Sequence, residues 1–328
     1  MQSLLSVKNL KTWFEIGGSG LFGGNSRALK AIDGVSFEIA HGEVLGLVGE
    51  SGCGKSTVGR TLTLLEKSSG GEARFEGQDI LKMSNAEFRP LRRSIQMIFQ
   101  DPFASLNPRL SIEQTLSEPL RIHEVATGRQ EIINVIADML TKVGLDPSVM
   151  ARYPHEFSGG QRQRIGIARV MILAPKLIIA DEAVSALDVS IQAQVLNLIK
   201  DLQQDSGVSM LFISHDLGVV RHISDRVAVM YLGRIAEIGR KEDIFTNPAH
   251  PYTKLLLSSI PSTKPGRKKV RDLGEPASAA SPPSGCAFHP RCPLASDICR
   301  STRPEAVSVG SDHLTACHHT DKAVDIAA

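Results

Sequence analysis

The alternation of hydrophobic and polar residues predicts strands in the first part of the chain. Residues 4–14 and 35–40 alternate as half-buried strands do, and the Gly-rich stretch 15–27 between them predicts a hairpin excursion. Short continuous apolar runs come next, and such runs are typical of strands that are buried on both faces. These runs cover residues 43–49, 176–181, 209–215 and 226–232.

Helical spacing of apolar residues fills the intervals between these runs. A helix is expected to start within residues 54–66, and residues 110–155 are predicted to be helical, with Gly144 as a stop. A further helix is expected between Ser190, a plausible N-cap, and Gly207, a C-terminal stop. Strands and helices that alternate in this way predict a mostly parallel sheet, covered on both faces, with ligands at the carboxyl ends of its strands.

Composition and charge narrow the class of protein. Apolar residues make up 42% of the 328 residues, which is ordinary for a folded chain of one large or two modest domains. The formal net charge of +2 gives no support to nucleic-acid binding, and the basic run at 264–271 is interpreted as a solvated linker. No stretch approaches the ~18 apolar residues of a membrane span, and the N-terminus lacks the signal-peptide pattern. We therefore expect a cytoplasmic location, with membrane contact only through partners.

The stretch after the first buried run carries a phosphate-binding pattern. Gly49, Gly54, Lys55 and Ser56 match G-x-x-x-x-G-K-[ST] between a predicted strand and a predicted helix. Backbone N–H groups of such a loop converge on a β-phosphate, the lysine reaches the β- and γ-phosphates, and the serine hydroxyl binds Mg²⁺. The strand–loop–helix context favours nucleotide binding over a Gly-rich turn without a ligand. The predicted nucleotide contacts of this loop also include Ser51, Gly52, Cys53 and Thr57.

Two carboxylates end a later buried run. Asp181 is placed to hold Mg²⁺ through water, and Glu182 is placed to orient or deprotonate the attacking water. Acidic residues at a strand end are often only solvated. In a chain that also carries a phosphate loop, a catalytic role is the favoured interpretation.

Upstream of these carboxylates, Ser158, Gly159, Gly160 and Gln161 resemble the signature motif of ATP-binding cassette (ABC) ATPases. Two small residues at a helix start leave backbone N–H groups accessible, which makes an anion site. In the family, this segment closes on the γ-phosphate that the opposite subunit binds. The resemblance therefore implies a dimer with ATP between two cassettes.

Other family motifs are present in the expected order. Gln100 resembles the Q-loop glutamine, which senses Mg²⁺ and connects to membrane subunits, and residues 185–188 resemble the D-loop. His215 resembles the switch histidine that contacts the γ-phosphate. Phe14 matches the aromatic residue that stacks on adenine, with Trp13 as the competing choice.

The resemblance over residues 5–240 implies an α/β fold. It consists of a P-loop NTPase (RecA-like) core with an antiparallel β subdomain, and with a helical subdomain inserted at about 100–158. Together these form a nucleotide-binding domain of residues 1–245. The family usually has proline after the catalytic glutamate, and Ala183 stands there instead. Because both carboxylates remain, we expect an altered rate rather than a loss of hydrolysis.

The C-terminal part resembles a subfamily. Residues 247–261 are similar to the extension of ATPases that serve oligopeptide and dipeptide importers, and residues 183–190 favour the second, "F"-type ATPase of the pair. The resemblance implies a heterodimer with a second ABC ATPase, two transmembrane permeases and an extracytoplasmic substrate-binding protein. It places the chain at the cytoplasmic face of the inner membrane, as a peripheral subunit that uses ATP and Mg²⁺.

Three alternatives stay open at this point. Related importers carry nickel, glutathione or glycans, and the ATPase never touches the cargo. Soluble cassette ATPases that act on ribosomes or DNA usually carry two cassettes or a long coiled-coil insert, and neither is visible in the sequence. A regulatory module that keeps nucleotide without hydrolysis is disfavoured by Glu182 and His215.

The predicted extension, residues 246–328, joins a Pro-rich linker at 262–285 to a cysteine cluster. Structural zinc sites usually include a close cysteine pair, which is missing, whereas four thiolates also suit an iron–sulphur cluster. Some members of the importer subfamily carry a [4Fe–4S] cluster on a similar set. We expect such a cluster as a structural staple, with zinc or free thiols as alternatives. The cysteines concerned are Cys286, Cys292, Cys299 and Cys317.

Overall fold

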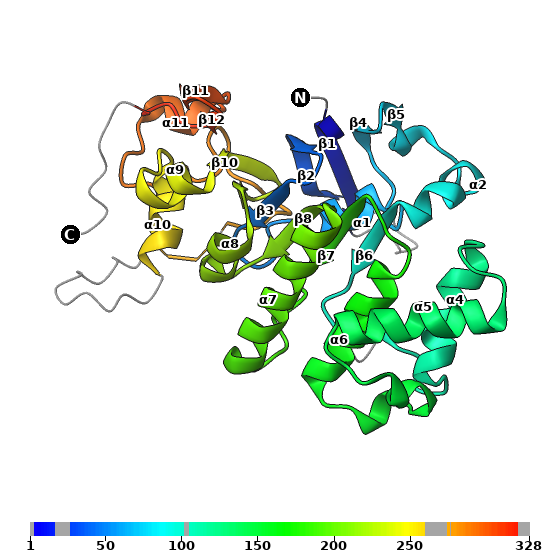
Figure 1. The fold of residues 1–328 in the computed structure, drawn as a ribbon. Helices are drawn as coiled ribbons and strands as arrows, with labels where there is room; N and C mark the ends of the chain where they lie inside the picture. The colour runs from blue at the N-terminus through cyan, green and yellow to red at the C-terminus, as the bar shows by residue number, and fades with distance from the viewer. Residues whose placement is uncertain (1–2, 17–26, 102–104, 260–273, 276, 321–328) are drawn as a thin grey trace. The chain divides into compact units, whose positions relative to one another are not determined.

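The computed structural model describes residues 3–16, 27–101, 105–259, 274–275 and 277–320. Most of the predicted hairpin excursion at 15–27 and of the linker at 262–285 lies outside these ranges, and so does the basic run at 264–271. The elements are drawn in Figure 1.

The strands, in chain order, are β1 (Ser3–Ile16), β2 (Arg27–Ala40), β3 (Val44–Val48), β4 (Gly70–Phe75), β5 (Gln78–Asp79), β6 (Ile95–Ile98), β7 (Leu177–Asp181), β8 (Ser209–Ser214), β9 (Arg226–Tyr231), β10 (Arg234–Arg240), β11 (Val307–Gly310) and β12 (His313–Thr315). The α-helices are α1 (Lys55–Leu62), α2 (Asn85–Phe88), α4 (Ile112–Ile122), α5 (Arg129–Lys142), α6 (Gly159–Met171), α7 (Val189–Ser206), α8 (Leu217–Ile223), α9 (Lys241–Thr246), α10 (Pro251–Ser258) and α11 (Asp297–Ser301). Short 3-10 helices are η1 (Ile80–Lys82), η2 (Arg89–Arg93), η3 (Pro147–Ala151), η4 (Pro154–Glu156) and η5 (His289–Arg291).

The chain divides into two compact units. The first unit comprises Met1–Leu4, Ile39–Val44 and Lys82–Ile213, and the second comprises Leu5–Glu38, Leu45–Leu81 and Ser214–Ala328. The second unit thus combines the predicted C-terminal extension with much of the predicted nucleotide-binding domain. The predicted division between residues 245 and 246 stays a prediction.

Parallel strands form the centre of the first unit. β6 pairs with β7, and β7 pairs with β8, both in parallel. Every residue of β7 and β8 is buried, which confirms the prediction from their continuous apolar runs. Each buried Leu or Ile of this kind contributes about 1.5–3 kcal/mol by leaving water.

Helices α4 and α5, which lie within the predicted helical segment, pack together with α6, which follows it, in the first unit. α4, α5 and α6 contact one another (Figure 1). Ser111 caps α4, because its hydroxyl accepts the Gln114 N–H while the Gln114 side chain accepts the Ser111 N–H. Beyond α5 the chain turns at Gly144, which has a left-handed φ of 72° and confirms the predicted stop.

Helix α7 starts earlier than expected. Its N-cap is Asp188, so the prediction of Ser190 was wrong. The backbone turns from extended to helical right after Asp188, and Ser190 lies inside the first turn. The predicted stop at Gly207 is confirmed, because this residue is the left-handed C-cap.

The second unit contains an antiparallel sheet and a mixed one. The antiparallel sheet has the strand order β2-β1-β4-β5. In the mixed sheet, β3 runs parallel to β9, and β10 is antiparallel to both β9 and β12. β11 and β12 form a hairpin, so residues near the C-terminus extend this sheet.

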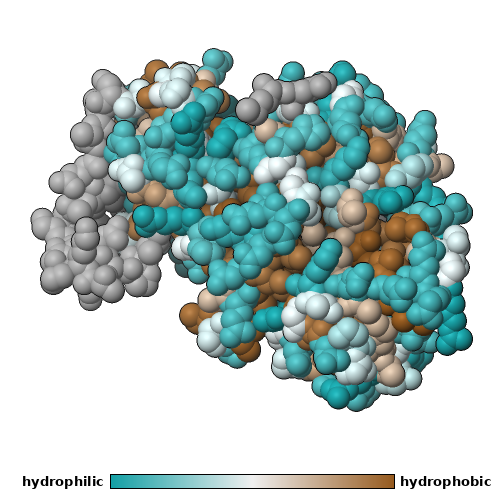
Figure 2. Space-filling model, in the orientation of Figure 1, coloured by the Kyte–Doolittle hydropathy of each residue, from teal (hydrophilic) through white to brown (hydrophobic). Residues whose placement is uncertain are grey.

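The visible face of the molecule is mostly hydrophilic, with hydrophobic patches between the polar residues (Figure 2). In the part of the chain that the structure describes, no helix is both long enough and apolar enough to cross a membrane.

Gly46 on β3 provides a test of packing in the second unit. A Cβ at this position would overlap side-chain atoms of Val220 in α8 and of Ser224 just after it. We expect Gly46→Ala to lower the free energy of unfolding by about 2 kcal/mol, as overpacking does, measured by urea denaturation. Gly70→Ala is the control, since the nearest atom, Lys11 Cδ, lies 3.8 Å away. Equal stability of the two variants would contradict this packing.

Candidate nucleotide-binding site

The phosphate loop connects β3 to α1 and is pressed against two strands. A Cβ on Gly49 would overlap the carbonyl oxygen of Met230 in β9, and one on Gly54 would overlap that of Ala31 in β2. Gly54 also has a φ of 104°, which other residues rarely adopt. Only glycine therefore fits both positions, and the loop backbone is held where its N–H groups can meet a ligand.

Lys55 spans this loop from the first position of α1. Its side chain is buried, and its Nζ donates to the carbonyl oxygens of Gly49 at 2.8 Å and Glu50 at 3.0 Å. Among the residues that the structure describes, no side chain caps the N-terminus of α1, so the first N–H groups and the helix dipole favour an anion there. The cationic Lys55 adds to that preference.

The remaining loop residues fall into exposed and covered positions. Ser51 and Gly52 are exposed at the tip of the loop, whereas Ser56 and Thr57 are half-buried in the first turn of α1. Cys53 is buried, and this burial raises the pKa of its thiol, against a smaller opposing effect of Lys55. A buried thiol of this kind is a small residue that fills space within the loop.

The two strand-end carboxylates lie in the first unit together with Gln100. Asp181, the last residue of β7, is buried. Glu182 has a left-handed φ of 48°, and its N–H donates to the Ile213 carbonyl at 3.0 Å. The Gln100 amide donates to Glu182 Oε2 at 2.9 Å. The structure therefore brings two predicted site residues into contact and holds Glu182 in a strained backbone conformation of the kind that clusters at functional sites.

The predicted signature segment begins α6, also in the first unit. Ser158 is the N-cap, and its side chain and that of Gln161 form a reciprocal capping box. A Cβ on Gly160 would overlap Ile191 of α7, so this glycine permits two helices to pack closely. Gly159 is half-buried at the start of the helix.

The other predicted contacts lie in the second unit with the phosphate loop. His215 follows β8 and is exposed, and Phe14 on β1 is half-buried. Trp13 is exposed, and the Lys30 Nζ lies 4.9 Å from the centre of its ring. Adjacent residues on a strand point to opposite faces, so at most one of the two aromatic rings can face a nucleotide. The choice of Phe14 stays a prediction.

A buried ionic network, which the sequence did not reveal, fixes the C-terminal residues in the second unit. Glu237 on β10 accepts from the backbone N–H groups of Ala249 and His250, and its Oε1 lies 2.7 Å from His313 Nε2 on β12. Burial raises the pKa of Glu237, but its hydrogen bonds outweigh this effect and keep the pKa below its ordinary value. The hydrogen bond to Glu237 raises the pKa of His313. The network thus favours a charged pair in a buried site.

A second set of unforeseen contacts reaches the phosphate loop itself. The Tyr252 hydroxyl on α10 accepts the Glu50 N–H at 3.0 Å. The Arg291 guanidinium donates two hydrogen bonds, of 2.8 and 2.9 Å, to the Glu50 carboxylate. Glu50 occupies a variable position of the loop pattern, so the pattern alone carried no sign of these partners.

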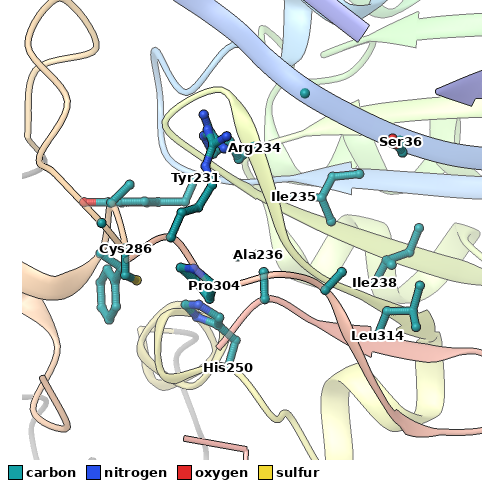
Figure 3. A pocket seen from close by; sticks show the side chains of 17 residues that line it. Ser36, Tyr231, Arg234, Ile235, Ala236, Ile238, His250, Cys286, Pro304 and Leu314 are labelled. Carbon is teal, nitrogen blue, oxygen red and sulfur yellow. The ribbon is translucent and has the colours of Figure 1, made fainter. Parts of the chain in front are cut away.

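An apolar cavity of about 260 Å³ lies between β10, β12 and the C-terminal residues (Figure 3). Ile235, Ile238 and Leu314 contribute apolar surface, and Tyr231 and His250 line it as well. None of the predicted nucleotide contacts lines this cavity. The cavity is therefore a separate feature from the phosphate loop.

The four C-terminal cysteines were expected to hold a metal cluster. The Cys286 N–H donates to the Cys299 carbonyl at 2.8 Å. Burial, reinforced by neighbouring thiols, raises the pKa of Cys292 to about 11 and also raises the pKa of Cys286 and Cys317. Among the described residues, no group of three or more His, Cys, Asp or Glu side chains is arranged to hold a metal ion. The expected iron–sulphur cluster is therefore not supported.

Comparison with protein families gives two matches. The model described as ABC transporter matches residues 32–185. The model described as oligopeptide/dipeptide transporter, C-terminal region, matches residues 236–299.

Similar sequences match almost the full chain. It is 52% identical over 322 residues to the oligopeptide transport ATP-binding protein AppF of Bacillus subtilis, covering 97% of each chain. It is 49% identical over 324 residues to the di/tripeptide transport ATP-binding protein DppF of Pseudomonas aeruginosa, covering 98% and 99%. Among solved structures, the dimeric post-hydrolysis state of the ATP-binding cassette MJ0796 bound to ADP and Pi matches with a TM-score of 0.64 and 26% identity. That match covers 72% of this chain and 98% of the other.

The buried His250 provides a test by pH. Burial lowers its pKa from 6.5 to about 4, so between these pH values the unfolded chain binds more protons than the folded one. The free energy of unfolding should therefore fall as the pH drops through this window, by up to roughly 3 kcal/mol from this residue. We expect His250→Asn, which cannot be protonated, to flatten that fall in denaturation measured from pH 7 to pH 4.

The control for this prediction is His41→Asn, which changes an exposed histidine and should leave the pH dependence as in the wild type. A fall that is equally steep in His250→Asn and the wild type would contradict the assignment to His250.

Proposed function

We propose that the chain hydrolyses ATP to drive peptide import, because it belongs to the oligopeptide and dipeptide transport group of ABC transporter ATP-binding proteins. One observation supports the ATP part of this proposal. Two strand carbonyls pack so closely on the phosphate loop that only glycine fits at Gly49 and Gly54, and Lys55 Nζ donates to the Gly49 carbonyl. The match of residues 236–299 to the C-terminal region of peptide transporters carries the import part.

The residues of the site divide the work as follows. The loop N–H groups and Lys55 bind the phosphates, and Glu182 takes a proton from the attacking water. Gln100 holds the Glu182 carboxylate through its 2.9 Å hydrogen bond. When bound, Mg²⁺ neutralises phosphate charge, and its ligands would be Ser56, Gln100 and Asp181. Most of the catalysis is positioning and charge neutralisation, for which rigid strand ends and helix starts are well suited.

The signature segment serves the site of a second cassette. In our proposal Ser158, Gly159, Gly160 and Gln161 contact the γ-phosphate that the partner binds, and His215 contacts the γ-phosphate of its own site. The dimeric MJ0796 cassette supports a paired arrangement. We propose that the partner is a second, different ATPase chain.

Peripheral attachment to membrane permeases completes the proposal. Phe99, Ile122 and Tyr153, within or beside the helical segment of the first unit, are large side chains exposed to solvent. In our proposal these side chains contribute to the contact with the membrane subunits. The chain would lie at the cytoplasmic face of the membrane. These permeases, with an extracytoplasmic binding protein, would determine the cargo. Nickel, glutathione and glycans are less supported as cargo, because the relatives named above are peptide transport proteins.

Glu182→Gln tests the proposed chemistry. The variant keeps the size of the side chain and one oxygen that can accept from Gln100, but it cannot accept a proton, so ATP turnover should fall by at least roughly 10²-fold. ATP binding should stay near that of the wild type, and uptake of a labelled peptide by cells that depend on the variant should stop. The assay is steady-state phosphate release in the presence of the partner ATPase. Turnover at the wild-type rate would contradict the role of Glu182.

The iron–sulphur cluster stays a finer hypothesis with its own test. If the four C-terminal cysteines hold it, anaerobically purified protein should contain about four iron and four sulphide per chain. Cys292→Ser should lose both, and the control Cys53→Ser, in the phosphate loop, should keep them. Iron-free wild-type protein with reactive C-terminal thiols would eliminate the hypothesis.

A further inference from the structure

Glu50, in the phosphate loop, contacts the C-terminal region, which here means the described residues between 246 and 320. All three of its polar groups have partners within the second unit. Its N–H donates to the Tyr252 hydroxyl at 3.0 Å, and its carbonyl accepts from Lys55 Nζ at 3.0 Å. Its carboxylate accepts both Arg291 hydrogen bonds. The conformation of this one loop residue is therefore determined jointly by the loop lysine and by two residues far along the chain.

A carboxylate in a phosphate-binding loop is electrostatically unfavourable. It lies one residue after Gly49, and a negative charge at that place repels a polyphosphate. Arg291 supplies the opposite charge in bidentate geometry, which is the strong form of this contact. The Arg291 side chain is 10% exposed and the Glu50 side chain is 26% exposed, so water screens this pair less than it screens a surface pair.

The partners of Glu50 are themselves held by packing. The Tyr252 ring is fully buried. Its centroid lies 4.6 Å from that of the Tyr231 ring and 5.4 Å from that of the Phe288 ring. Arg291 ends η5, and its guanidinium carbon lies 5.8 Å from the centre of the Phe288 ring. Neither partner is a loose surface side chain, so each presents its polar atoms to Glu50 from a fixed position.

We infer that Arg291 and Tyr252 are positioning residues of the nucleotide site, acting through Glu50. Arg291 neutralises the carboxylate and draws it onto the C-terminal region, while Tyr252 fixes the direction of the Glu50 N–H. The C-terminal region is thereby a working part of the ATP site, and displacing it weakens ATP binding. The inference rests on the ATP binding proposed above.

A purely structural role for the pair predicts something different. If Arg291 only attached the C-terminal region to the rest of the unit, removing the Glu50 charge would not compensate for its loss. If Arg291 acts by neutralising Glu50, then Arg291→Ala leaves a bare carboxylate beside the phosphates, and Glu50→Gln in the same chain removes the repulsion. Restoration in the double variant therefore distinguishes the two roles.

The experiment titrates the full-length protein with a fluorescent ATP analogue and records thermal unfolding without nucleotide. We expect Arg291→Ala to weaken binding roughly tenfold, about the value of one charge-assisted hydrogen bond. Arg291→Ala with Glu50→Gln should recover to within about threefold of the wild type. Tyr252→Phe, which keeps the ring, should weaken binding by about threefold. The Tyr252→Phe variant also keeps the inference testable if Arg291→Ala does not fold.

The matched control is Arg303→Ala. Arg303 lies in the same C-terminal region and forms an ion pair with Asp33, with 3.0 Å between Nη2 and Oδ2, but its partner lies outside the phosphate loop. It should bind the analogue as the wild type does. Unchanged binding in both Arg291→Ala and Tyr252→Phe, no recovery in the double variant, or equal weakening by Arg303→Ala would overturn the inference. Failure of the wild type to bind would instead overturn the nucleotide site itself.

Discussion

The close approach of two strand carbonyls to the phosphate loop is the constraint on which the site depends. Met230 of β9 and Ala31 of β2 leave no room for a side chain at Gly49 or Gly54. With the loop held in this way, Lys55 can reach back across it to two carbonyl oxygens. The ammonium, the uncapped helix start and the loop N–H groups then favour the same ligand, a polyphosphate. Since β2 and β9 belong to different sheets, the shape of the loop depends on the folding of the whole second unit.

The C-terminal region is part of that unit in a structural sense. β12 pairs with β10, and Glu237 joins β10 to His313 and to the chain before α10. From this base, Tyr252 and Arg291 reach Glu50. Resemblance alone suggested a cassette with an appended tail. The contacts instead describe a region whose strands complete a sheet and whose side chains meet the site.

The sequence predicted what depends on local pattern and missed what depends on distant contacts. The phosphate loop, the buried strands and the stops at Gly144 and Gly207 follow from spacing and glycine chemistry. The partners of Glu50 lie 202 and 241 residues away, and no pattern of period two or 3.6 connects them. The left-handed backbone conformation of Glu182 could not be predicted from the sequence either, because non-glycine residues rarely adopt it and nothing in the local pattern marks this one. β11 has only exposed residues, so its place in a sheet could not be inferred from hydrophobic alternation.

Peptide import by this chain is tested most directly by identifying what it binds in its own cell. The tagged chain would be purified from native membranes in mild detergent, and its partners would be identified by mass spectrometry. We predict that two multi-span permeases and a second cassette ATPase are recovered, with a peptide-binding protein attached. Recovery of ribosomal proteins or DNA-processing factors, with no membrane subunit, would contradict it.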